Sequence, residues 1–87
     1  MKFEKSFVSR ESRYSLGIEA DSHSHYIAIP MSNRMIDYME YYKLSEHEFQ
    51  DFLEDPAAAS EFAESCRRRE QDSRLFMQPG TDRGVPR

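Results

Sequence analysis

Two runs of alternating residues, separated by a short polar segment, constrain the fold of this chain more than any other feature. Residues 14–20 alternate apolar side chains with polar ones or glycine, and residues 25–31 resume the pattern. A period of two is typical of a strand with one buried face. The intervening Asp-Ser-His-Ser segment, residues 21–24, has short side chains that bond their own backbone in turns. The sequence therefore predicts a β-hairpin.

A four-residue loop at 21–24 places the large apolar residues of both predicted strands on one face. Pairing across a buried sheet requires this arrangement, because a slip of one residue would move every side chain to the other face. The predicted cross-strand pairs are Ala20 with His25, Ile18 with Ile27, Leu16 with Ile29, and Tyr14 with Met31.

Three further strands and two helices complete the predicted elements. Residues 3–8 form a short first strand, residues 35–44 form a strand after a turn at 32–34, and residues 74–78 return to the sheet. Helix starts are marked by Ser45, with a glutamate three residues later, and by Asp55, followed by proline. Apolar residues then recur at helical spacing: Phe49, Phe52 and Leu53 in the first helix, and Ala58, Phe62 and Cys66 in the second.

These elements predict an α+β fold, an antiparallel meander of three to five strands with two helices packed on one face. A chain of 87 residues suits one domain. We expect that domain to span residues 1–78. Residues 79–87 are rich in glycine and proline and are expected to form a C-terminal tail.

The charge of the chain is unevenly placed. The formal net charge is −4, yet residues 36–55 alone hold seven acidic residues against Lys43, a net charge of −6. Phosphate binding needs an excess of lysine and arginine, so nucleic acid is not the expected partner. An acidic segment of this kind attracts basic partners and speeds their encounter.

Cysteine content and hydropathy predict a cytoplasmic protein with no membrane association. The single cysteine, Cys66, cannot form an internal disulfide, which favours a reducing compartment. No apolar run approaches the roughly 20 residues of a membrane span. The first residues, Met-Lys-Phe-Glu-Lys, lack the apolar core of a signal peptide.

The predicted strand at 35–44 is the strongest candidate for a binding surface, since it carries apolar or aromatic residues on both faces. One interpretation is a central strand that is covered on both sides. The other exposes Met39 and Tyr41, flanked by Asp37 and Lys43, as a recognition patch in which tyrosine supplies rigid contact area. The predicted partner-binding residues are Asp37, Met39, Glu40, Tyr41, Lys43, Glu46 and Asp51.

Candidate catalytic and metal-binding residues are few. His23 and His25 form an HxH pair without a third ligand cluster, and Cys66 lies on the apolar stripe of a helix, where thiols usually pack as small hydrophobes. The sequence therefore predicts no catalytic site, no metal site and no cofactor. A small hydrolase built on Glu40, His25 and Cys66 remains the enzymatic alternative.

Four segments carry a resemblance to a known group of proteins: residues 25–33 (HYIAIPMSN), 37–42 (DYMEYY), 55–59 (DPAAA) and 66–70 (CRRRE). Over residues 14–85 the chain resembles the short bacterial immunity proteins encoded beside polymorphic toxins, including those of contact-dependent growth inhibition. The resemblance implies a protein that binds and blocks one cognate toxin domain, often a nuclease. It transfers no defined binding residues. A small acidic adaptor or regulatory subunit that binds another cytoplasmic protein is the alternative.

Overall fold

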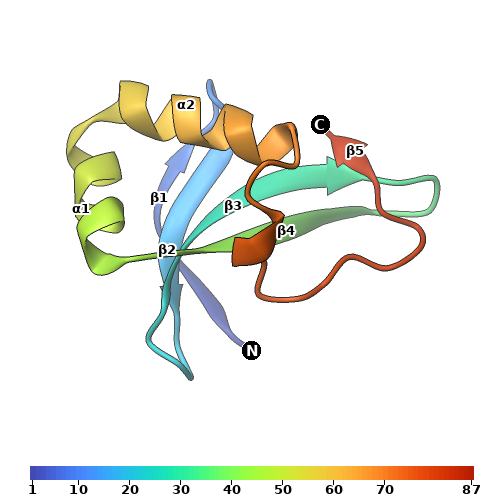
Figure 1. The fold of residues 1–87 in the computed structure, drawn as a ribbon, viewed down its shortest axis with the longest axis horizontal. Helices are drawn as coiled ribbons and strands as arrows, with labels where there is room; N and C mark the ends of the chain where they lie inside the picture. The colour runs from blue at the N-terminus through green and yellow to red at the C-terminus, as the bar shows by residue number, and fades with distance from the viewer.

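The first four strands form an antiparallel meander in which neighbours in the chain pair with each other, and the short fifth strand pairs with the third. A computed structural model describes all residues, 1–87. Two helices cross one face of the sheet (Figure 1), so the predicted α+β class is confirmed. The elements are β1 (Phe3–Ser9), β2 (Tyr14–Glu19), β3 (His25–Ser32), β4 (Asp37–Leu44), α1 (Glu46–Glu54), α2 (Pro56–Arg67), the 3-10 helix η1 (Asp72–Arg74) and β5 (Val85–Pro86).

Both helices begin at the predicted caps. The Ser45 hydroxyl accepts a hydrogen bond from the Glu48 amide at 3.0 Å, and the Glu48 carboxylate accepts one from the Ser45 amide at 2.8 Å. Asp55 caps α2 by accepting from the Ala58 amide at 3.2 Å. Each cap gives a partner to amides that have none within the helix, so these local signals fix where the helices start.

The hairpin of β2 and β3 forms as predicted, but its register differs from the prediction by two residues. Ile18 pairs with His25 and Leu16 pairs with Ile27. The turn is wider because the Glu19 carboxylate folds into it and accepts hydrogen bonds from the amides of Asp21 and Ser22. A shift of two residues keeps every side chain on its predicted face.

The strand predicted at 35–44 begins two residues later, at Asp37. The Asn33 side-chain oxygen accepts hydrogen bonds from the Met35 and Ile36 amides, at 2.8 and 2.9 Å, so these residues belong to the turn. Asparagine side chains commonly satisfy turn amides in this way. As a result Met35 and Ile36 are exposed at 84% and 57%.

The main core lies between the helices and the sheet. It includes Ile27 and Ile29 of β3, Phe49 of α1, and Ala59 and Ala63 of α2, all of them buried, whereas Ala58 is only partly buried. Cys66 is buried there as predicted, whereas Phe62 is only partly buried and packs its ring against Phe52. The twelve buried members are Tyr14, Leu16, Ile27, Ile29, Met31, Tyr42, Leu44, Phe49, Ala59, Ala63, Cys66 and Leu75.

The opposite face of the sheet is covered in part by β1. A register irregularity between Lys5 and Phe7 marks a β-bulge, which increases the local twist of a strand. The Glu4 carbonyl passes so close to Gly17 that a Cβ atom at that position would lie 2.1 Å from its oxygen. Only glycine permits this approach, which brings Phe3 over the face where Tyr26 is fully buried.

Residues 79–87 are not the free tail that the sequence predicts. Val85 and Pro86 of β5 pair with the end of β3, and the Arg87 amide donates to the Pro30 carbonyl at 3.1 Å. Gly84 is buried so closely against Ser32 that a Cβ atom would lie 2.2 Å from the Ser32 carbonyl oxygen. The predicted strand at 74–78 is also wrong, because only a single bridge, Leu75 with Tyr42, forms there.

Candidate functional site

Strand β4 directs its predicted binding residues to two different faces. Met39 and Tyr41 pair with Pro30 and Ala28 of β3 and lie on the face away from the helices, together with Asp37 and Lys43. Glu40 lies on the helix-covered face. The strand order also places β4 at the edge of the four-stranded meander. Neither interpretation of this strand is therefore complete, because it is not a central strand and Met39 and Tyr41 are only partly exposed.

An aromatic cluster fixes the position of Tyr41. Its ring stacks on Phe3, with 3.6 Å between ring centroids and an interplanar angle of 9°. Phe76 meets Phe3 edge-on at 5.2 Å, and Tyr26 meets Tyr41 edge-on at 5.1 Å. The Lys43 amine lies 5.3 Å from the centre of the Phe76 ring, within the range of a cation–π contact. Burial raises the pKa of Tyr41, so its hydroxyl stays neutral at physiological pH.

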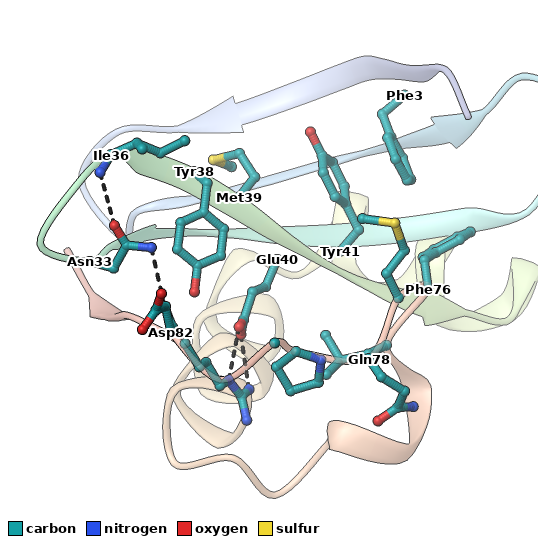
Figure 2. Close-up of a pocket in the computed structure, with 15 residues that line it drawn as sticks. Phe3, Asn33, Ile36, Tyr38, Met39, Glu40, Tyr41, Phe76, Gln78 and Asp82 are labelled. Carbon is teal, nitrogen blue, oxygen red and sulfur yellow. Dashed lines mark hydrogen bonds and ion pairs between the residues drawn. The ribbon is translucent and has the colours of Figure 1, made fainter.

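Beside this cluster lies a groove of about 290 Å³, between β4 and the segment 75–83 (Figure 2). We call it the β4 groove. Its rim carries two strongly exposed apolar side chains, Ile36 and Met77, at 57% and 66%. The residues that line it are Phe3, Asn33, Ile36, Tyr38, Met39, Glu40, Tyr41, Leu75, Phe76, Met77, Gln78, Pro79, Gly80, Asp82 and Arg83.

The outer edge of β4 lies open along part of the groove. The Tyr41 carbonyl accepts a hydrogen bond from the Phe76 amide at 3.0 Å, which shows that Tyr41 points its backbone groups away from β3. Backbone direction alternates along an antiparallel strand, so the amide and carbonyl of Met39 point the same way. Backbone groups and apolar side chains therefore face the groove together.

Glu40 closes one wall of the groove through a buried ion pair. Arg83 donates to both oxygens of its carboxylate, at 2.8 and 2.9 Å, and also to Asp72 at 2.7 and 2.9 Å. The Tyr42 hydroxyl donates to Glu40 as well, at 2.9 Å. Hydrogen bonds to Asp72 and Glu40 raise the pKa of Arg83, while burial raises the pKa of Tyr42. With its side chain only 6% exposed, Glu40 lies away from the surface that Met39 and Tyr41 offer.

Three of the seven acidic residues in 36–55 are paired with arginines near the end of the chain. Asp37 pairs with Arg87 at 3.3 Å, and Arg74 donates to both oxygens of Glu48 at 2.9 Å. Glu40 pairs with Arg83, as described above. The local charge sum over residues 36–55 did not reveal these pairs, because the partners are distant in sequence.

Glu46 and Asp51 lie on α1, apart from the β4 groove. Both are exposed. The Asp51 carboxylate oxygen Oδ2 lies 3.1 Å from Nδ1 of His47, one helical turn away. Figure 1 shows α1 at the other end of the sheet from the turn between β3 and β4. The structure thus separates the predicted residues into an apolar and aromatic groove and an acidic helix surface. It adds Phe3 and Phe76, which the sequence did not mark as functional.

The residues of the enzymatic alternative have other structural roles. Cys66 is buried, and burial raises the pKa of its thiol to about 12, far from that of an activated nucleophile. Glu40 is held by Arg83, and the His25 ring packs against Phe49 with 4.6 Å between ring centroids. No three histidine, cysteine, aspartate or glutamate side chains group closely enough to hold a metal ion.

Comparison with known proteins found no matching protein family, no matching characterised relative and no matching solved structure. None of the helices is both long enough and apolar enough to span a membrane.

Proposed function

We propose that this protein binds and neutralises a cognate toxin domain and that the β4 groove is the centre of the interface. The observation that carries the proposal is the gathering of Met39, Tyr41, Phe76, Met77 and Ile36 around one partly exposed concavity. Aromatic residues and methionine are enriched at protein interfaces, and energetically dominant residues cluster in such desolvated pockets.

The groove is held in shape before a partner arrives. Stacking against Phe3 restricts Tyr41, and the Glu40–Arg83 pair anchors the segment that forms the facing wall. A preorganised site loses less side-chain freedom on binding, so more of the contact energy contributes to affinity. The open backbone groups of Met39 add hydrogen-bonding capacity at the strand edge.

The exposed acids of α1, and Asp55 directly after it, support a basic partner. Glu46, Asp51, Glu54 and Asp55 are exposed, and none pairs with a lysine or arginine within 4.0 Å. Such a surface raises the association rate of a basic toxin, a nuclease-type domain among them, without itself forming the tight contacts. We place this activity in the cytoplasm of the producing cell, following the resemblance to immunity proteins.

The test is protection from a toxin. A candidate toxin domain, taken from the gene next to the one for this chain, is expressed from an inducible promoter with the wild-type protein or with Tyr41→Ala. We expect the wild type to restore growth and Tyr41→Ala to lose protection at equal protein level. Phe7→Ala is the matched control, since Phe7 is an aromatic residue of β1, 40% exposed, and does not line the groove.

A different result would favour the adaptor alternative. If no neighbouring toxin is neutralised, yet Tyr41→Ala and not Phe7→Ala abolishes the binding of a purified cytoplasmic protein, the groove serves a partner other than a toxin. If both variants protect as well as the wild type, the interface does not include the β4 groove.

A further inference from the structure

A second concavity, of about 400 Å³, lies on the sheet face opposite the helices. Its size falls in the range of small-molecule sites. Four basic side chains line it: Lys5 of β1, Arg10 and Arg13 of the β1–β2 turn, and Arg87. All four residues are exposed. A third of the twelve lysines and arginines of an acidic protein therefore lies around one concavity, which we call the basic groove.

The charges of the basic groove are largely uncompensated. Lys5, Arg10 and Arg13 have no carboxylate within 4.0 Å, and only Arg87 has one, pairing with Asp37 at 3.3 Å. Elsewhere the arginines of this chain mostly pair with carboxylates, as Arg83 does inside the fold. Unpaired cations that converge from separate elements create a local positive potential that attracts an anion.

Helix α2 holds the turn that carries two of these arginines. Arg67 donates hydrogen bonds to the carbonyls of Ser12 and Arg13, at 2.7 and 2.6 Å. The Ser60 hydroxyl donates to the Ser12 hydroxyl at 2.8 Å. The turn is thereby fixed with Arg13 in the left-handed backbone region, at a φ of 56°. The backbone that carries Arg10 and Arg13 is positioned before any ligand binds.

The floor of the basic groove contains a hydroxyl without a partner. The Ser15 hydroxyl oxygen is buried and makes no hydrogen bond, and Ser15 itself lines the concavity. A buried polar group without a partner costs about 1–3 kcal/mol, so such groups are rare unless something satisfies them. A ligand oxygen that displaces the covering side chains would supply the missing bond.

We propose that the basic groove binds a small organic phosphate. The guanidinium groups of Arg10 and Arg13 match phosphate oxygens with paired hydrogen bonds, and Lys5 adds a third cation. The Ser15 hydroxyl meets a phosphate oxygen at the floor. Val8, Pro30 and Met39 form an apolar wall on the same face, which accommodates the organic part of the ligand. The site is separate from the proposed toxin-binding residues, except that Met39 borders both grooves.

The experiment is an NMR titration of the full chain with phenyl phosphate and with inorganic phosphate. We expect saturable shifts at residues of the basic groove, with phenyl phosphate binding more tightly than inorganic phosphate. Arg10→Gln with Arg13→Gln should weaken binding at least about tenfold, because the charge-assisted hydrogen bonds are lost. The matched control is Arg34→Gln with Arg68→Gln, which makes the same charge change at exposed positions outside the groove. Ser15→Ala should weaken binding without destabilising the free protein, since its hydroxyl has no partner there.

Other outcomes would overturn the proposal. Equal weakening by the two double variants would mean that net charge alone attracts the ligand. Tighter binding of a tetraglutamate peptide than of phenyl phosphate would assign the groove to carboxylates. Affinity that grows with the length of a single-stranded oligonucleotide would assign it to nucleic acid. Unchanged binding by Ser15→Ala would show that the Ser15 hydroxyl does not contact the ligand.

NMR spectra that stay native-like for every variant are the control that the variants are folded.

Discussion

The two faces of the sheet are closed by different means. The helix-covered face is a continuous hydrophobic core in which Leu16, Ile27 and Ile29 are completely buried. The other face is closed at one end by the stack of Phe3 on Tyr41, and it is open at the other, where the basic groove lies. The helix-covered face is built from elements that follow one another in the chain. The other face depends on residues near the two chain ends, Phe3 and Arg87.

This difference separates stability from recognition. Side chains of the core have little contact with solvent, so they cannot reach a partner. The open face and the adjoining edge of β4 expose Met39, Tyr41 and Met77 beside a rigid scaffold, as binding surfaces require. Substitutions on the helix-covered face should therefore lower the free energy of unfolding, whereas substitutions on the open face should change binding.

The largest effect is expected in the core. Ile27→Ala removes a fully buried side chain and leaves a cavity, which should lower the free energy of unfolding by about 4 kcal/mol. That loss is a large fraction of the free energy of unfolding of a small domain. Val8→Ala on the open face, where Val8 is 49% exposed, should cost less than about 1 kcal/mol. Urea unfolding measures both, and equal losses would contradict the division between the faces.

The next effect concerns the C-terminal segment. Arg83→Met leaves the Glu40 carboxylate buried with only the Tyr42 hydroxyl as a side-chain partner, which should cost about 3 kcal/mol. Adding Glu40→Gln to this variant should recover part of the loss, because the unpaired charge is then gone. Arg68→Met, which breaks an exposed pair with Glu70, should cost less than about 1 kcal/mol. A double-mutant cycle that finds no coupling between Glu40 and Arg83 would show that the segment is held by other contacts.

Tyr41→Ala should act on binding more than on folding. We expect a loss of about 2 kcal/mol in affinity, mainly through faster dissociation, because a central aromatic anchor is removed. Tyr41→Phe keeps the stack on Phe3 and should retain most of the affinity. Surface plasmon resonance against the captured toxin domain measures both rates. Unchanged dissociation for Tyr41→Ala would place the interface elsewhere.

A smaller effect, expected only at acidic pH, concerns how β1 is held over the open face. Hydrogen bonds from the Ser22 hydroxyl and from the amides of Lys2 and Asp21 lower the pKa of Glu19 to about 2, from an ordinary 4.5. Since the folded pKa is the lower one, this stabilisation is complete above pH 4.5 and is lost as the pH falls toward 2. Glu19→Gln should flatten the fall in stability over that window.

Unfolding measured across the same window checks the role of Glu19. Glu48 also has a lowered pKa, through its bonds from Arg74, so Glu19→Gln should reduce the slope rather than abolish it. A slope identical to that of the wild type would show that the turn does not depend on the ionised carboxylate.

The smallest effect is expected for the acids of α1. Glu46→Gln with Asp51→Asn should slow toxin association by about two- to fivefold and flatten its salt dependence, with little change in dissociation. Glu11→Gln with Glu61→Gln makes the same charge change at exposed residues elsewhere and serves as the control. If both pairs slow association equally, net charge rather than the α1 surface steers the partner.

Local patterns predicted the elements of this fold well, and long-range contacts account for the errors. The alternation at 14–20, the capping box at Ser45 and the Asp55-Pro56 start each depend on residues close together in the sequence. The register of β2 and β3 was missed because the buried carboxylate of Glu19 widens the turn. The return of residues 79–87 was missed because glycine and proline gave no pattern to detect.

The candidate site was predicted only in part, for the same reason. Tyr41 and Met39 were identified because their strand is apolar on both faces, but their neighbours Phe3 and Phe76 lie far away in sequence. In the structure, the alternation of β4 places Glu40 on the face opposite Tyr41, although both were predicted from the sequence to bind a partner. Only the tertiary structure, which places Arg83 beside Glu40, shows that Glu40 forms a buried ion pair.

The sequence by itself determined the two helices, the four-strand meander and the faces that β2 and β3 bury, because hydrogen bonding and side-chain periodicity act over a few residues. The tertiary structure decided which charges remain free. A charge sum over residues 36–55 suggests a single acidic surface, yet folding brings Arg74, Arg83 and Arg87 to its carboxylates and leaves Arg10 and Arg13 unpaired. Electrostatic interaction depends on distance in space, and distance along the chain does not determine it.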